Sequence, residues 1–142
     1  MTDSKNYLRQ VERLDARIKN KLIERQQWKD IALGITANMG GEKVQSSGSQ
    51  QKMADAIVKC VDMESEINSL IDELISAKKE VISTIERLDS PTEYDVLHKR
   101  YIQYMTLQEI ADDYGRDYTT ITTCHGRALK NVQVLLDKGV TK

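Results

Sequence analysis

The 142-residue chain has little of what a β-sheet protein uses. Aromatic residues make up 5% of it, phenylalanine is absent, and there are one proline and seven glycines. Sheets are enriched in aromatic residues and are punctuated by glycine- and proline-rich turns. Charged residues, in contrast, make up 30% of the chain. The composition therefore predicts an all-α protein with long helices and a thin core, in one domain or two small ones.

Cysteine is scarce, and a long apolar run is missing. Cys60 and Cys124 are the two cysteines, and neither belongs to a C-x-x-C pair or a His/Cys cluster. We therefore predict no metal site and no cofactor. The first seven residues are polar, which argues against a signal peptide, and no apolar stretch approaches the length of a membrane span. We expect a cytoplasmic protein without a membrane partner.

An excess of positive charge is also missing, since the net charge is -1 and the isoelectric point is near 6.1. The charge is nevertheless unevenly spread. Residues 1–30 hold eight Lys/Arg against five Asp/Glu, whereas residues 52–91 hold five against nine. Residues 115–142 hold five Lys/Arg against two Asp/Glu. Because local charge decides how a surface meets phosphate, the C-terminal end remains a candidate for nucleic-acid binding.

Apolar residues recur at helical spacing through the first part of the chain, which predicts a helix from Asn6 to Met39. A segment rich in Gly, Ser and Gln follows, from Met39 to Gln51. This segment reads as a loop, either a flexible connector or a binding loop at the tip of a hairpin. The apolar stripe of the first helix begins with Tyr7, Val11, Leu14, Ile18 and Leu22.

The most regular pattern lies between Lys52 and Leu88. With Met53 as position a of a heptad, ten of the eleven a and d positions are apolar. Five heptads favour a coiled-coil-like helix, and one loop between two long helices predicts an antiparallel helical hairpin. A two-helix hairpin buries little apolar surface by itself. We therefore expect residues 1–89 to form an oligomerisation domain, as a homodimer or a higher homo-oligomer.

A second domain is predicted over residues 90–142. Ser90, Pro91 and Glu93 form an S-P-x-E start signal for a helix that runs to about Gln103. Thr106 and Glu109 form a second capping box, and Gly115 provides a sharp turn before a last helix. Three short helices with such a turn predict a small helix-turn-helix domain, whose last helix would lie in the major groove of DNA.

The exposed side of the last helix is mostly threonine. Threonine offers a hydroxyl to phosphate or base and a methyl to thymine, glycine permits close approach, and arginine and lysine reach phosphates. We predict double-stranded DNA as the partner and weak binding by a monomer, because basic contacts are few. The predicted DNA-binding residues are Thr106, Arg116, Tyr118, Thr119, Thr120, Thr122, Thr123, Gly126, Arg127 and Lys130.

The stretch LHKRYIQYMTLQEIADDYGRDYTTITTCHGRALKNVQ resembles region four of bacterial sigma factors. It departs from that pattern by lacking a run of arginines and by carrying Asp112 and Asp113. With YLRQVERLDARIKNKL and VQSSGSQQKMADAIVK added, nearly the whole chain resembles small phage-encoded transcriptional regulators of Gram-positive bacteria, of the ArpU and RinA type. This resemblance implies a phage or prophage regulator that acts in the bacterial host cell.

Catalysis is not expected. Cys124 and His125 are neighbours on a helix and point about 100° apart, so they cannot form a Cys–His pair. We predict His125 to be a surface or phosphate-facing residue.

An alternative to DNA binding stays open, because the acidic middle helix suits a protein-interaction module. Such a module would bind host RNA polymerase or a repressor and have little affinity for DNA.

Overall fold

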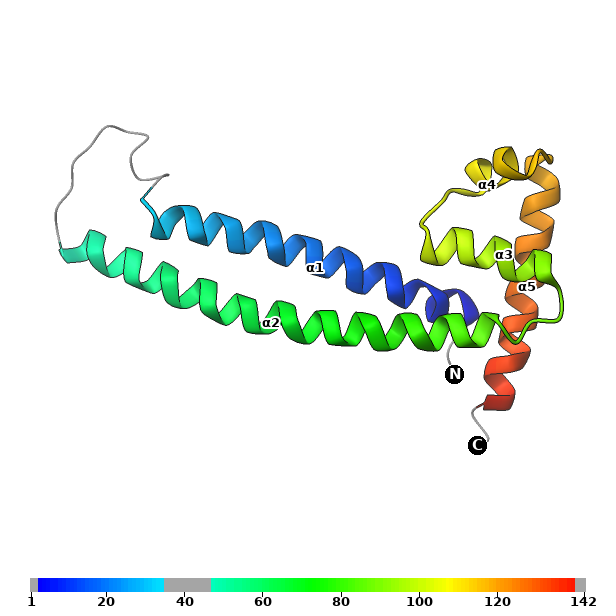
Figure 1. The fold of residues 1–142 in the computed structure, drawn as a ribbon, viewed down its shortest axis with the longest axis horizontal. Helices are drawn as coiled ribbons and strands as arrows, with labels where there is room; N and C mark the ends of the chain where they lie inside the picture. The colour runs from blue at the N-terminus through cyan, green and yellow to red at the C-terminus, as the bar shows by residue number, and fades with distance from the viewer. Residues whose placement is uncertain (1–2, 35–46, 140–142) are drawn as a thin grey trace. The chain divides into compact units, whose positions relative to one another are not determined.

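The computed structural model describes residues 3–34 and 47–139, and within these ranges the chain is helical with no strands (Figure 1). The all-α prediction is confirmed for this part of the chain. No helix among these residues is long and apolar enough to cross a membrane. The elements are α1 (Ser4–Ala32), α2 (Ser47–Ile85), α3 (Pro91–Leu97), the π-helical turn η2 (His98–Ile102), α4 (Leu107–Tyr114) and α5 (Tyr118–Gly139).

The ends of the two long helices differ from the prediction. Helix α1 ends at Ala32 rather than at Met39, and Gly34 follows with a left-handed φ of 77°, as is usual just beyond a helix end. Helix α2 begins at Ser47, so residues 47–51 are helical where a loop was predicted. The remainder of that predicted loop lies outside the described residues.

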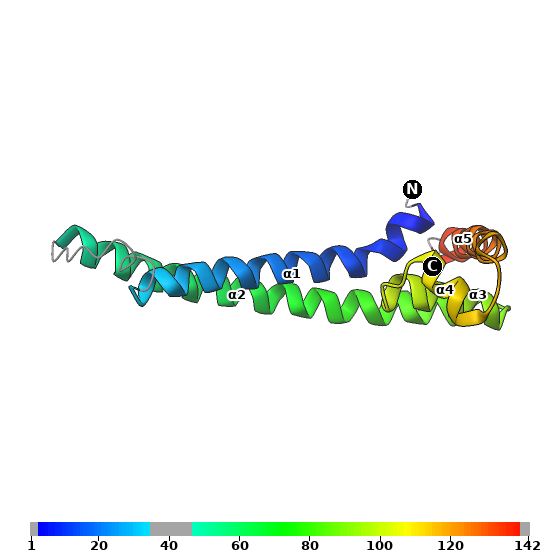
Figure 2. The same cartoon turned by 90° about the horizontal axis from the view of Figure 1, so that it is seen from above.

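The chain divides into two compact units, which we describe separately. Unit 2 comprises Asp15–Glu73. In this unit α1 and α2 lie side by side in both views (Figure 2). Lys21 pairs with Glu66 at 2.9 Å and Arg25 with Glu64 at 2.6 Å, so rising numbers in α1 meet falling numbers in α2. The two segments are therefore antiparallel. The buried apolar residues here are Ile18, Ala56, Met63, Ile67 and Leu70.

Unit 1 comprises Met1–Leu14 and Leu74–Lys142. Its main core combines the start of α1 and the end of α2 with the last residue of α3, η2 and α5. Tyr7 Oη lies 2.8 Å from Thr84 Oγ1, and this hydrogen bond joins the two long helices inside the core. The core thus draws on both sides of the division predicted at residue 89. Its buried members are Tyr7, Leu8, Val11, Ala77, Val81, Ile85, Leu97, Tyr101, Ala128 and Val132.

A smaller core holds α3, α4 and α5 together within unit 1. It consists of Val96, Ile110, Ala111 and Ile121, with Met105, Leu107, Tyr114 and Cys124 packed around it. The predicted helix up to Gln103 is interrupted by η2, a π-helical turn that the sequence pattern did not indicate. The chain then turns at Tyr104, a non-glycine residue with a φ of 64°. This turn sets the direction of α4.

Candidate nucleic-acid interface

Helix α4 and the turn after it have the local structure that the sequence predicted. Thr106 Oγ1 accepts a hydrogen bond from Glu109 N at 3.1 Å, and Glu109 Oε1 accepts one from Thr106 N at 2.8 Å. The capping box is therefore complete. Gly115 ends the helix with a φ of 66°, a conformation that costs other residues free energy. Helix α5 begins three residues later.

One face of α5 is buried. Ile121, Ala128 and Val132 lie in the two cores, as the helical spacing predicted. His125 is also buried, so the prediction of a surface or phosphate-facing histidine is wrong. His125 follows Ile121 by four residues and precedes Ala128 by three, which places it on the same face. The same helical spacing that places the apolar residues on the buried face therefore also indicates that His125 is buried.

Buried His125 is held by Tyr101 of η2. Tyr101 Oη and His125 Nε2 are 2.8 Å apart, and the two rings stack with centroids separated by 5.7 Å. Burial, reinforced by the positive charges of Arg100, Lys5 and Arg9, lowers the pKa of His125 to about 4. The ring is therefore neutral at physiological pH, and its Nε2 can accept a hydrogen bond from the tyrosine hydroxyl.

Eight of the ten predicted DNA-binding residues lie on α5, away from its buried face, whereas Thr106 caps α4 and Arg116 lies in the turn between α4 and α5. Of the ten, Thr122 and Gly126 are half-buried and the other eight are exposed. The Thr122 hydroxyl donates to the Thr119 carbonyl oxygen at 2.9 Å, so this proton is already engaged with the helix backbone. An added Cβ at Gly126 would meet no atom within 4 Å. Packing inside the protein therefore does not require glycine at this position.

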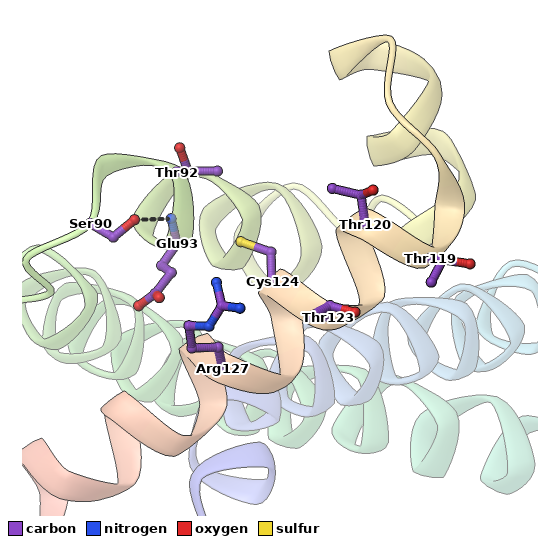
Figure 3. Close-up of a pocket in the computed structure, with 8 residues that line it drawn as sticks. All are labelled: Ser90, Thr92, Glu93, Thr119, Thr120, Thr123, Cys124 and Arg127. Atoms are coloured by element: carbon purple, nitrogen blue, oxygen red, sulfur yellow. Dashed lines mark hydrogen bonds between the residues drawn. The ribbon is translucent and has the colours of Figure 1, made fainter.

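A hollow of about 490 Å³ lies between the start of α3 and the first turns of α5 (Figure 3). It brings together four of the predicted residues: Thr119, Thr120, Thr123 and Arg127. The Arg127 side chain is directed toward Glu93 and Cys124 (Figure 3). The other six predicted residues do not line this hollow. The remaining lining residues are Ser90, Thr92, Glu93 and Cys124.

Glu93 gives the hollow an acidic residue that the sequence analysis did not assign to the site. Its backbone N–H donates to Ser90 Oγ at 3.2 Å, which is half of the predicted capping box. Its side chain is buried and accepts a hydrogen bond from Asn131 Nδ2 at 2.7 Å. Burial, and then the Glu93 charge, raise the pKa of the Cys124 thiol. A nucleophilic thiolate is therefore disfavoured here.

A polar cluster ties α4 to the preceding helices. The Tyr114 hydroxyl donates to Asp95, and burial together with this hydrogen bond raises the pKa of Tyr114. Lys99 of η2 lies 3.9 Å from Asp95 and 3.2 Å from Asp113. One of the two acids that depart from the sigma pattern is therefore paired with a lysine. The other, Asp112, accepts a hydrogen bond from Gln108.

Comparison with known proteins places the chain in a family. A family model described as "Protein of unknown function (DUF1492)" matches residues 35–133. The chain belongs to this family. The DUF1492 match includes all ten predicted DNA-binding residues and the hollow beside α3, but it does not include α1. No curated protein and no solved structure matches the chain.

Proposed function

We propose that the protein is a phage or prophage transcriptional regulator that binds promoter or operator DNA. In this proposal α3, α4 and α5 act as a helix-turn-helix domain, and α5 enters the major groove. The two faces of α5 support this arrangement, because one is fixed in the cores and the other is exposed and rich in hydroxyls. The exposed stripe consists of Thr119, Thr123 and Lys130 together with the half-buried Thr122 and Gly126 between them.

Gly126 carries the proposal. Glycine inside a helix costs about 1 kcal/mol relative to alanine, and open space surrounds the position where a side chain would begin. No neighbouring group within the protein explains why glycine stands here despite this loss of stability. Close approach of a partner to the helix backbone would explain it, and a nucleic-acid strand makes such an approach where arginine and threonine neighbours contact its phosphates.

Self-association belongs to the same proposal. The sequence supplies few basic residues on the reading face, and binding that rests on few phosphate contacts is weak. A helical hairpin formed by α1 and α2 that joins two copies would double these contacts. We therefore propose a homodimer, or a higher homo-oligomer, as the form that binds DNA.

One observation favours the alternative of a protein-interaction module. The buried Glu93 carboxylate lies in the hollow beside Arg127, where a phosphate would meet negative charge. A basic side chain of host RNA polymerase or of a repressor would instead be attracted. In that alternative the hollow, rather than the exposed stripe of α5, would be the principal contact.

The first test is binding of the full chain to the intergenic DNA beside its own gene. Fluorescence anisotropy over a salt series, with unrelated competitor DNA, separates specific from non-specific binding. We expect specific binding that the T122A/R127A double variant reduces at least tenfold. R17A is the control, because it removes an exposed arginine from unit 2. Absence of specific binding at moderate salt would contradict the proposal and favour the protein-interaction alternative.

A sharper test uses Gly126→Ala. Alanine should raise the free energy of unfolding by about 0.5–1 kcal/mol, because it is the better helix former. The same variant should weaken specific DNA binding at least tenfold, because its methyl group blocks close approach. Gly139→Ala is the matched control, since its added Cβ also meets no atom within 4 Å. A Gly126→Ala variant that is stabilised and binds DNA normally would show that no partner approaches this position.

A further inference from the structure

Unit 2 carries an apolar surface along one side of α2. Met53, Ile57, Val61 and Ile71 are exposed, and their spacing places them on one stripe of the helix. Glu64 lies on the same stripe. Because Glu64 pairs with Arg25 at 2.6 Å, the Arg25 side of α1 borders this surface.

Helix α1 and the residue that follows it contribute two exposed leucines to the same side; Leu33 lies just beyond the end of α1, but its N–H still donates to the Lys29 carbonyl oxygen at 2.9 Å, as in a helical turn. Leu22 precedes Arg25 by three residues, and Leu33 follows it by eight, which keeps both near the Arg25 side of the helix. Leu33 adjoins Gly34, where an added Cβ would lie 3.9 Å from Met53 Cε. The apolar surface therefore extends over both helices of unit 2. We call it the unit 2 face, and its members are Leu22, Leu33, Met53, Ile57, Val61 and Ile71.

We propose that the unit 2 face binds the same face of a second copy of this chain. The inference deepens the proposed self-association, on which it rests, by assigning its surface. Contiguous exposed apolar residues mark association surfaces when polar residues surround them. Here the Arg25–Glu64 pair lies in the middle of the face. When helices associate through an apolar surface, an isolated polar contact within that surface fixes how the two copies align along their length.

Charge complementarity selects a second copy and its orientation. In unit 2, residues 15–34 hold five Lys/Arg against three Asp/Glu, whereas residues 47–73 hold two against six. Stacking α2 on the partner's α2 would bring acidic helices together. Stacking α1 on the partner's α2 brings opposite charges together, and complementary potentials of this kind fix orientation.

This orientation makes the pairing geometrically specific. A two-fold axis parallel to the long axis of the hairpin places α1 of each copy against α2 of the other. Residues at the same position along this axis then face each other. Lys21 is level with Glu66 and Arg25 with Glu64 within one copy. By the same register, Leu33 falls within one turn of Ile57 of the second copy, and Leu22 falls level with Glu66, which lies between Val61 and Ile71. The two chains then leave the paired surface at the same end.

The test compares two neighbouring positions on α2. Ile57 is 54% exposed and Val58 is 59% exposed, but they point about 100° apart, and only Ile57 belongs to the unit 2 face. Sedimentation equilibrium of the full chain should show a dimer at micromolar concentration. Ile57→Arg should raise its dissociation constant at least tenfold, while Val58→Arg, with the same added charge, should leave it unchanged. Circular dichroism should show that both variants retain their helices.

Each other result has a defined meaning. A wild-type chain that stays monomeric at 100 µM overturns both the inference and the proposed self-association. A dimer that neither variant weakens, or that both weaken equally, overturns the inference alone. Specific DNA binding, measured separately, decides the proposed DNA contact independently of either result.

The orientation has its own test in a Cys60→Ser, Cys124→Ser background. A short bis-maleimide should link Leu33→Cys copies to Ile57→Cys copies when the two are mixed. Linkage between Ile57→Cys and Ile71→Cys copies instead would show that α2 packs on α2 and would overturn the proposed orientation.

Discussion

The same two helices have different surroundings in the two units. In unit 1 the start of α1 and the end of α2 are covered by η2 and α5, so that Leu8, Val81 and Ile85 are fully buried. In unit 2 most heptad positions of α2, such as Ala56, Met63 and Ile67, are buried, but the unit 2 face stays exposed and includes the first heptad position, Met53. A regular apolar pattern therefore specifies which helices pair, whereas full burial depends on a further layer.

The largest effect that should separate the units comes from two leucines of α1. Leu8 in unit 1 is fully buried, whereas Leu22 in unit 2 is 44% exposed. Leu8→Ala should lower the free energy of unfolding by about 3 kcal/mol, because it leaves a cavity. Leu22→Ala in dilute protein should change it by less than about 1 kcal/mol.

The aromatic residues provide separate probes for this comparison. Trp28, the single tryptophan, lies in unit 2, and all six tyrosines lie in unit 1. Urea unfolding followed by tryptophan and by tyrosine fluorescence should therefore report the two units individually. Equal losses for Leu8→Ala and Leu22→Ala would mean that unit 2 is as closely packed as unit 1.

A pH effect should be confined to unit 1. The pKa of His125 is lowered from 6.5 to about 4, so the unfolded chain binds a proton more readily than the folded chain. Stability is therefore full above pH 6.5 and falls as the pH drops toward 4. Between pH 7.5 and pH 5 the free energy of unfolding should fall by about 2 kcal/mol, because each unit of pKa difference between the folded and unfolded chain corresponds to about 1.4 kcal/mol.

Urea titrations at these two pH values check the expectation, with His125→Gln as the control. Glutamine can still accept a hydrogen bond from Tyr101 but does not titrate. The variant should lose most of the pH dependence in the tyrosine signal. A wild-type curve that is flat above pH 5 would show that His125 is not held neutral in the folded protein.

The smallest of these effects concerns backbone strain, which unit 1 carries at Tyr104. A left-handed φ of 64° costs a non-glycine residue about 1 kcal/mol, and the surrounding core maintains it. Tyr104→Gly and Tyr104→Ala both remove the packed side chain, but only glycine accepts this backbone conformation. We expect the glycine variant to be about 1 kcal/mol more stable than the alanine variant in urea unfolding. An alanine variant of equal stability would argue against the strain.

Local patterns predicted much of this structure. The Thr106–Glu109 capping box and the Gly115 turn depend on residues a few positions apart, and they formed as expected. Most a and d positions of α2, among them Ala56, Met63 and Ile67, are buried, because heptad spacing fixes which side of a helix is apolar. The ten predicted DNA-binding residues remain a prediction, although their exposure is compatible with that role.

Features that depend on distant residues were missed. Glu93 looked like the second half of a capping box, but its carboxylate turned to Asn131, 38 positions away. His125 is buried with its ring stacked on Tyr101, 24 positions earlier in the chain. The π-helical turn η2 and the strained Tyr104 likewise reflect how α3 and α4 must be joined over a shared core. Sequence spacing alone contains none of these tertiary constraints.

The hydrogen bond between Ser4 and Gln133 has a consequence for synthesis on the ribosome. Ser4 N donates to Gln133 Oε1 at 2.9 Å, across 129 positions of sequence. The first turn of α1 leaves the ribosome long before its partner Gln133 in unit 1 has been translated. Unit 2 has its whole chain available sooner. Unit 1 must therefore fold late, and until then Leu8 and Val11 stay open to aggregation or to chaperones.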